Sequence, residues 1–399
     1  MSDPALGGGG EGPGAATVAS RLSGYVRGGG IITPLVTVVF AFFVAGLVIA
    51  VTGGDPLETY KAIFDGSGLN WFFQIPWDFD SAAAFNLQQT LIQTTTLILV
   101  GLAVAFAFRC GMFNIGGQGQ YIASAIFAVW IGSSFDGLSP VLHVLLALVV
   151  GTLMGALVAG IAGFLKAVRG VHEVISTIML NWTLIYVSLF LFGPGGPLQN
   201  DVPGQEAVGV SNDVVEGAKL HVFWGDPLLQ GLHIGFFFAL AALVVYWIIL
   251  NRTTLGYGVK AVGFNPEAAR YGGISVARNY FLAMAISGAF AGLAGAIDTL
   301  GYLYRIGSDV EVSSNVAFVG IAVALLGRNT AIGVGLAALL FGALLTGTST
   351  RNLDPEIFEP ELAGNLSTLI QGLVILFVGL DVVVLWFLGR LRRKRAVAT

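Results

Sequence analysis

Ten apolar runs, most of them close to the length of a membrane span, dominate this sequence. A helix needs about 20 mostly apolar residues to cross the hydrocarbon core of a bilayer. Bounded by charged residues, Pro or Gly clusters, the runs lie at 31–52, 87–108, 119–134, 141–166, 174–192, 233–250, 279–300, 316–326, 330–347 and 366–388. The sequence therefore predicts an all-α, polytopic membrane protein with about ten transmembrane helices. The runs at 119–134 and 316–326 are short, so each is either a full span or a half-helix.

Composition supports a membrane environment and offers little for metal or redox chemistry. Hydrophobic residues make up 55% of the chain and charged residues only 11%, whereas a soluble chain carries roughly a quarter charged residues. Cys110 is the single cysteine, so the chain cannot form an internal disulfide, and the four histidines show no metal-ligand spacing. We expect neither a metal site nor a cofactor.

Lys and Arg set the expected orientation, because positive charge is retained on the cytoplasmic side of a membrane. With the N-terminus inside and ten crossings, 15 of the 19 basic residues fall in inner loops and tails. The other four, Lys61, Lys219, Arg305 and Arg351, fall in outer loops. The split predicts that both termini are cytoplasmic and supports the number of spans.

The two ends of the chain differ from its apolar body. Residues 1–30 contain GGGG and GGG, lack apolar periodicity and are expected to form a flexible cytoplasmic tail. The alternative is a signal peptide, but the apolar stretch that follows Arg21 and Arg27 is longer than an h-region and no clear cleavage site follows it. We expect a transmembrane domain over 31–389 and a basic cytoplasmic tail over 390–399.

A short helix is expected inside the predicted cytoplasmic loop 252–278. Asn265 can cap free N–H groups, Pro266 suits the first helical position, and Glu267 faces the positive end of the helix dipole. Ala268, Ala269 and Arg270 continue the helix, and Gly272 ends it. An ordinary ordered loop is the alternative. A stiff helix projecting from a membrane bundle can receive force from a soluble motor.

The segment FRCGMFNIGGQGQY, residues 108–121, lies between two apolar runs and is expected to interrupt the helix. Its glycines make a continuous helix costly, while Asn114, Gln118 and Gln120 are polar without charge. Irregular backbone at membrane depth faces protein or a water-filled cavity, so these residues are candidates for a translocation path. A cytoplasmic turn is the alternative. The chain contains no G-x-x-x-x-G-K-[ST] phosphate loop, so we expect no ATP site.

Polar residues also mark the start of the fifth run, in GVHEVISTIMLNW, residues 170–182. Glu173, Thr177 and Asn181 are spaced four apart and share one helical stripe. The stripe can line a passage or provide hydrogen bonds between helices; we favour the second role for Thr177 and a functional role for Glu173. Gly288, Gly292 and Gly295 are expected to form a helix-packing face. Asp298 and Asp381, near span ends, are expected to be structural.

Together, three segments resemble the permeases of bacterial ABC importers for simple sugars and nucleosides, the group that also contains the ribose and branched-chain amino acid permeases. FNIGGQGQ (113–120), GVHEVISTIMLN (170–181) and AVGFNPEAARYGGI (261–274) occur in the order and spacing of that family. The likeness extends over about 87–385, and the middle motif is most similar to the nucleoside-type branch.

The resemblance implies a core of two permease subunits, commonly a heterodimer, with two cytoplasmic ABC ATPases and an extracellular or periplasmic solute-binding protein. It makes 265–272 the coupling helix that docks in an ATPase, through Asn265, Pro266, Glu267, Ala268, Ala269, Arg270 and Gly272. The family often has Glu at the position of Gln118 and Asn at that of His172. These departures weaken a charge-based role for the first motif and polar recognition at the second.

We therefore expect a permease subunit in a bacterial inner membrane that moves nucleosides or simple sugars by alternating access, driven by separate ATPases. An enzyme is not expected, because H-E-x-x-H, G-x-S-x-G and paired catalytic carboxylates are absent from the sequence. Partners would include the lipid bilayer but no nucleic acid. The main alternative is an ion-coupled secondary transporter, for which Glu173, Asp298 and Asp381 are the available acids.

Overall fold

The structure is a computed structural model that describes residues 32–51, 54–135, 137–204, 207–307 and 316–349, with scattered positions between 365 and 376. The expected tails at 1–30 and 390–399, most of the predicted span at 366–388, and Asp381 lie outside the described residues.

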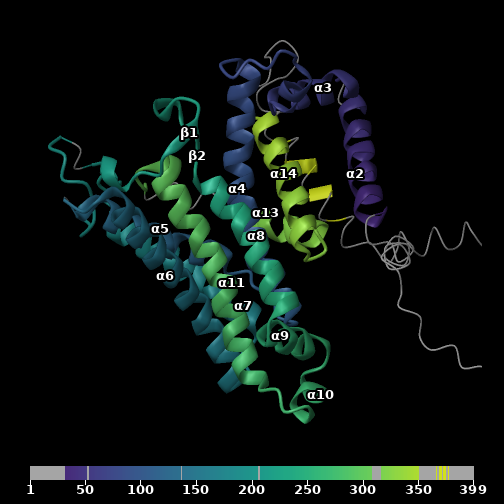
Figure 1. The fold of residues 1–399 in the computed structure, drawn as a ribbon, viewed down its shortest axis with the longest axis vertical. Helices are drawn as coiled ribbons and strands as arrows, with labels where there is room; N and C mark the ends of the chain where they lie inside the picture. The colour runs from purple at the N-terminus through teal and green to yellow at the C-terminus, as the bar shows by residue number, and fades with distance from the viewer. Residues whose placement is uncertain are drawn as a thin grey trace, which may run out of the picture.

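Helices account for most of the described chain (Figure 1). They are α2 (Ile32–Val51), α3 (Pro56–Gly66), α4 (Ala82–Arg109), α5 (Gly117–Ser134), α6 (Pro140–Arg169), α7 (Glu173–Phe192), α8 (Gly235–Arg252), α9 (Thr254–Phe264), α10 (Pro266–Tyr271), α11 (Val276–Asp298), α13 (Val316–Leu326) and α14 (Ala331–Gly347). A π-helical turn, Thr299–Leu303, extends α11. The shorter elements are the 3-10 turns Leu69–Phe73, Glu216–Ala218 and Pro227–Leu229 and the strands β1 (Val222–Trp224) and β2 (Leu232–His233).

The described helices confirm a multi-pass membrane protein but not the number ten. Six of them are long and apolar enough to cross a bilayer, namely α2, α4, α6, α7, α8 and α11 with its π-helical extension. At 1.5 Å per residue, the 18-residue α5 is about 27 Å long and the 11-residue α13 about 16 Å. In its described part, α13 reaches about half of the roughly 30 Å hydrocarbon thickness, whereas α5 nearly matches it.

Two local features of the fold differ from the expected spans. Helix α4 begins at Ala82, five residues before the predicted 87, because the Ser81 hydroxyl caps it by accepting from the Ala84 N–H at 3.2 Å. Helix α3 was not predicted; Asp55 caps it and Pro56 starts it. The connection between the predicted spans 174–192 and 233–250 contains β1, which pairs antiparallel with β2. The described chain is therefore mostly rather than wholly helical.

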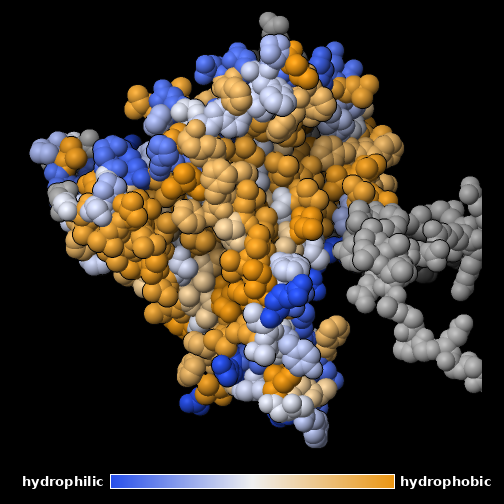
Figure 2. All heavy atoms as spheres, in the orientation of Figure 1, coloured by the Kyte–Doolittle hydropathy of each residue, from blue (hydrophilic) through white to orange (hydrophobic). Residues whose placement is uncertain are grey.

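Helix α4 is the centre of the bundle. It is buried along nearly its whole length and packs against α8, α11, α13 and α14. Most of the surface of α2, α6, α7 and α8 is exposed and carries large apolar side chains. Figure 2 shows hydrophobic residues over the middle of the visible face and hydrophilic ones mostly toward its two ends, the arrangement that a bilayer requires.

Glycines bring α6 and α11 into backbone contact. A Cβ added at Gly288 would lie 2.3 Å from the Gly155 carbonyl oxygen, and one at Gly292 would lie 3.0 Å from the Gly151 oxygen. Such small residues allow close helix approach in membranes. The packing face predicted at Gly288 and Gly292 is thus confirmed; Gly295 also packs closely, but against Tyr121 of α5.

Candidate functional site

Helix α10 projects at one end of the molecule, beyond α9 and α11 (Figure 1). Asn265 has extended backbone and ends α9 while it caps α10: its side-chain oxygen accepts from the N–H groups of Glu267 at 2.9 Å and Ala268 at 3.1 Å. Pro266 takes the first helical position, where a missing N–H costs nothing. The short helix predicted from these residues is therefore present, and the separate helix α9 before it was not predicted.

The end of α10 is built by glycine and by one buried alanine. Gly272 donates its N–H to the Ala268 oxygen at 3.0 Å, and Gly273 follows with a φ of +78°, which L side chains rarely adopt. Ile274 then donates to the Ala269 oxygen at 2.9 Å. Ala269 is buried, whereas Glu267, Ala268 and Arg270 are exposed, so the segment rests on the bundle through one side chain and presents the others outward.

Two aromatic residues, one just before α10 and one at its last position, are almost completely exposed. Phe264 is 92% exposed and Tyr271 is 95% exposed. Exposure of a large aromatic side chain to water is unfavourable, and such residues are enriched among the hot spots that contribute most to binding at protein interfaces. Sequence reasoning missed both, although an aromatic residue just before the cap and another at the end of the short helix were visible signals. They make α10 a candidate docking element.

The segment between α4 and α5 is held by a reciprocal pair of amides. Asn114 Nδ2 donates to Gln120 Oε1 at 2.9 Å, and Gln120 Nε2 donates to Asn114 Oδ1 at 2.9 Å. Asn114 Nδ2 also donates to the Ser287 hydroxyl at 2.7 Å, which links the segment to α11. The irregular backbone predicted here covers 110–116 only; Gly117 and Gly119 lie in the first turn of α5, contrary to the expectation that they interrupt the helix.

Asn181 explains how a glycine-rich sequence starts a helix. Its Oδ1 accepts from the Gly119 N–H at 2.8 Å, and its Nδ2 donates to the Ile115 carbonyl at 2.9 Å. A Cβ at Gly119 would lie 3.0 Å from the Asn181 Cα, so glycine allows α5 and α7 to approach this closely. These tertiary bonds offset the low helix propensity of glycine, about 1 kcal/mol per residue.

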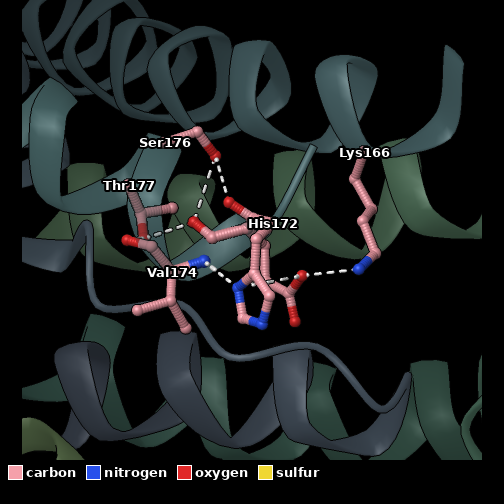
Figure 3. A network of polar contacts seen from close by, with 6 residues as sticks. Lys166, His172, Val174, Ser176 and Thr177 are labelled. Carbon is pink, nitrogen blue, oxygen red and sulfur yellow. Dashed lines mark hydrogen bonds and ion pairs between the residues drawn. The ribbon is translucent and has the colours of Figure 1, made fainter. Parts of the chain in front are cut away.

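The start of α7 carries an ion pair that connects it to α6 (Figure 3). Glu173 Oε2 lies 2.8 Å from Lys166 Nζ and 3.9 Å from His172 Nδ1. His172 caps α7, since its Nδ1 accepts from the Val174 N–H at 3.3 Å. Thr177 donates its hydroxyl to the Glu173 carbonyl at 2.8 Å, within α7. Sequence reasoning counted Lys166 only among the inner charges and missed its pairing.

The structure thus places all six candidate path residues in the protein interior. Asn114, Gln118, Gln120, Glu173, Thr177 and Asn181 are buried. A cavity of about 330 Å³ between α5, α6 and α7 is lined by other residues, all apolar or aromatic, including Phe127, Trp130 and Met154. Side-chain hydrogen bonds or an ion pair join different segments at Asn114, Gln120, Asn181 and Glu173. Their part in a translocation path stays a prediction.

Asp298, which with Glu173 is one of the two described acids available to an ion-coupled mechanism, is fully buried at the end of α11. Its carboxylate accepts from the Thr96 hydroxyl at 2.6 Å and the Tyr121 hydroxyl at 2.9 Å. It therefore joins α11 to α4 and α5. Among the described residues, no cluster of three or more His, Cys, Asp or Glu is arranged to hold a metal ion.

Comparison with known proteins decides the family. Residues 86–379 match the family described as the permease component of branched-chain amino acid transport systems. The chain belongs to this permease family. The resemblance inferred from the three motifs is thereby confirmed, and the match covers all but the first four residues of α4 and every described helix after it.

Several curated members of the permease family are similar to the chain. The guanosine ABC transporter permease protein NupP of Bacillus subtilis is 36% identical over 92% of this chain and 98% of its own length. The nucleoside ABC transporter permease protein NupB of Lactococcus lactis is 34% identical over 82% and 87% of the two chains. The glucose ABC transporter permease protein TsgB13 of Haloferax volcanii is 31% identical over 87% and 86%.

A second permease from each of the first two organisms matches as well. NupQ of B. subtilis, also a guanosine ABC transporter permease protein, is 29% identical over 63% of this chain, and NupC of L. lactis, a nucleoside ABC transporter permease protein, is 26% identical over 63%. No solved structure matches the chain.

Proposed function

We propose that this chain is the transmembrane permease subunit of an ATP-binding-cassette importer for nucleosides or simple sugars, driven by separate ATPase subunits. The observation that carries the proposal is the projecting helix α10, with its exposed Glu267 and Arg270, in a chain 36% identical to a guanosine permease over nearly its whole length. The relatives named for nucleosides precede the one named for glucose in identity, which favours a nucleoside as the first solute to test.

The proposal assigns the energy source to a partner. The sequence contains no phosphate-binding loop of the G-x-x-x-x-G-K-[ST] type, whose backbone N–H groups cradle nucleotide phosphates. Helix α10 can transmit force because it is short, capped at both ends and in contact with α9 and α11. We assign the ATPase contact to Asn265, Pro266, Glu267, Ala268, Ala269, Arg270 and Gly272, of which the buried Ala269 holds the helix on the bundle.

The same proposal covers the orientation of the permease in the membrane and its partner subunits. The α10 end of the bundle lies in the cytoplasm, as the basic-residue split favours, in a bacterial plasma membrane. A second, different permease completes the membrane core, by analogy with the relatives that occur as NupP with NupQ and NupB with NupC. An extracellular or periplasmic binding protein delivers the solute to the opposite end.

The buried amide network is assigned to the moving part of the permease. Alternating access needs groups that exchange partners as helices shift, and Asn114, Gln120 and Asn181 join the α4–α5 segment to α7 and α11. Gln118 and Thr177 are also buried, Gln118 two residues before Gln120 and Thr177 four residues before Asn181. Glu173 closes one edge of it through Lys166.

Uptake by whole cells that carry or lack the gene tests the function. Radiolabelled guanosine and glucose are supplied, and ATP is depleted with arsenate or the proton gradient is collapsed with a protonophore. Gene-dependent uptake of one of the two solutes that stops with arsenate and persists with the protonophore is expected. Uptake that survives arsenate and stops with the protonophore identifies an ion-coupled secondary transporter and refutes the proposal.

A further inference from the structure

Arg109, the last residue of α4, is the central side chain of a tight contact at the α10 end of the bundle. Its Nε and Nη2 atoms donate to the Asn329 carbonyl oxygen at 3.0 and 2.7 Å, and Nη2 lies 3.4 Å from the Arg328 oxygen. The Tyr246 hydroxyl of α8 donates to the same Asn329 oxygen at 2.8 Å. Two side chains from two helices thus converge on one carbonyl in the turn between α13 and α14.

That turn has an unfavourable backbone. Arg328 and Asn329 both have a φ of +52°, in the left-handed region that L residues other than glycine seldom occupy. Two such residues in succession persist only where surrounding contacts determine the conformation. The guanidinium of Arg109 and the phenol of Tyr246 supply those contacts. The turn is therefore in a conformation that depends on α4 and α8.

The main chain of Arg109 also supports the segment that leads to α10. A Cβ added at Gly263, in the last turn of α9, would lie 2.3 Å from the Arg109 carbonyl oxygen. Gly111 has a φ of +72°, and a Cβ added there would lie 3.3 Å from the Gly263 Cα. Backbone therefore rests on backbone, two residues before the Asn265 cap, so α10 is unable to shift far without displacing the end of α4.

Helix α13 connects the same turn to the amide network. A Cβ at Gly320 would lie 2.5 Å from Val100 Cγ1 of α4, and one at Gly117 would lie 3.3 Å from Ala317 Cβ. Gly117 begins α5, next to the Asn114–Gln120 amide pair. The 11 residues of α13 thus run from the Arg109 contact to the polar segment in the middle of the bundle.

We propose that Arg109 is a positioning residue that couples α10 to α13, so that a displacement of α10 moves the turn at Asn329 and shifts α13 against Gly117. This inference rests on the proposed function, because it assumes that an ATPase moves α10. Its parts form one contiguous chain of packed backbone and hydrogen bonds, along which energetic coupling between distant sites can be carried. A purely structural role would fix the turn without affecting how much solute is moved per ATP.

The test measures guanosine transported per ATP hydrolysed by the complete importer in proteoliposomes, with its second permease, ATPase and binding protein. Arg109→Gln is expected to lower this ratio about tenfold, within the usual range of coupling between sites, with the complex still assembled. Arg109→Lys is expected to be intermediate, because an ammonium lacks the planar fork of a guanidinium. The matched control is Arg169→Gln, an exposed arginine at the end of α6.

Two further variants keep the test decisive if Arg109→Gln fails to assemble. Tyr246→Phe removes one of the donors to the Asn329 oxygen with almost no change in volume and is expected to lower the ratio about threefold. Gly263→Ala is expected to lower it as well, against Gly217→Ala, where an added Cβ meets nothing within 4 Å. The proposal is overturned if Tyr246→Phe and an assembled Arg109 or Gly263 variant keep the wild-type ratio of guanosine transported per ATP hydrolysed. This holds even if transport and hydrolysis both become slower.

The outcome for wild type separates this inference from the proposed function. If the wild-type complex moves no guanosine or glucose on addition of ATP, the proposed function fails whatever Arg109 does. If wild-type transport depends on ATP and the variants keep the wild-type ratio, the proposed function stands and only the role of Arg109 is refuted.

Discussion

Lys166 and Glu173 form an ion pair of 2.8 Å across the turn that joins α6 to α7 (Figure 3). The side chains are 25% and 10% exposed, so both charges are largely withdrawn from water. Gly170, with a φ of +67°, ends α6 and turns the chain so that the two residues meet. The pair therefore fixes the angle at which α7 enters the bundle.

Removing one partner of this pair is expected to destabilise the protein more than removing both. Lys166→Met leaves the Glu173 carboxylate buried without its cation, at a cost of about 2 kcal/mol in the free energy of unfolding. The double variant Lys166→Met, Glu173→Gln is expected to recover part of that loss. Thermal unfolding of the purified protein in detergent compares wild type, Lys166→Met and the double variant.

The exposed pair of Lys219 and Glu216 provides the control. Glu216 is 87% exposed on its side chain, and surface ion pairs contribute little to stability. Glu216→Gln is therefore expected to leave the unfolding temperature unchanged. A drop equal to that of Lys166→Met would show that the α6–α7 pair has no special role.

Asn181 is expected to be less replaceable than its position in an apolar helix indicates. Asn181→Ala leaves the Gly119 N–H and the Ile115 carbonyl without their partner, for a loss of about 1–2 kcal/mol if each bond has the modest value measured between membrane helices. Asn181→Asp accepts from Gly119 but faces the Ile115 oxygen with a second acceptor, so it is expected to be worse than alanine. Thermal unfolding of both variants checks the order; Asn251→Ala, at an exposed position, is the control.

Local sequence signals predicted the elements whose ends depend on neighbouring residues. The Asn265-Pro266-Glu267 cap needs only the next two N–H groups, and it was found from sequence. Asp55-Pro56 is the same kind of capping signal at the start of α3. Helix α3 was missed because the expected spans rest on apolar runs long enough to cross a membrane, and α3 has only 11 residues. Membrane spans were predicted well where about 20 apolar residues run together, as in α7.

Contacts between segments far apart in the chain were beyond the sequence. Nothing local shows that Asn181 caps a helix that starts 64 residues earlier, and its bonds with Gly119 and Ile115 are what make α5 helical from Gly117. The polar stripe of Glu173, Thr177 and Asn181 was identified correctly as a stripe. Its partners, Lys166, Gly119 and Ile115, depend on how α5, α6 and α7 pack, which no helical period contains.

Cys110 is expected to be inert in the folded protein. The thiol is buried, and burial raises its pKa to about 12; at pH 7.5 the thiolate fraction is then below about 10⁻⁴, and the thiolate is the reactive form. We expect no labelling by a maleimide at pH 7.5 within minutes, and full labelling after denaturation. Rapid labelling of the native protein would contradict the burial of this residue.

An unreactive native cysteine allows single introduced cysteines to report orientation. Tyr271→Cys lies at the last residue of α10, and Leu228→Cys lies in the turn between β1 and β2. The native residues are 95% and 90% exposed. With intact cells, a membrane-impermeant maleimide is expected to label Leu228→Cys and to reach Tyr271→Cys only in inverted vesicles. The reverse pattern would place α10 outside the cell and exclude its contact with a cytoplasmic ATPase.

Phe264 and Tyr271 are expected to contribute more to ATPase binding than the charged side chains of α10. Both aromatic rings are almost fully exposed in this chain, and burial of such rings commonly dominates the affinity of an interface. Phe264→Ala and Tyr271→Ala should each weaken binding of the partner ATPase by about tenfold or more, with little change in unfolding temperature, because neither ring packs in the bundle. The double variant Glu267→Ala, Arg270→Ala is expected to weaken ATPase binding less.

Phe73→Ala is the control, since this aromatic residue is 78% exposed at the opposite end of the bundle. Equal loss of ATPase binding in Phe73→Ala, or no loss in the α10 variants, would refute docking through α10.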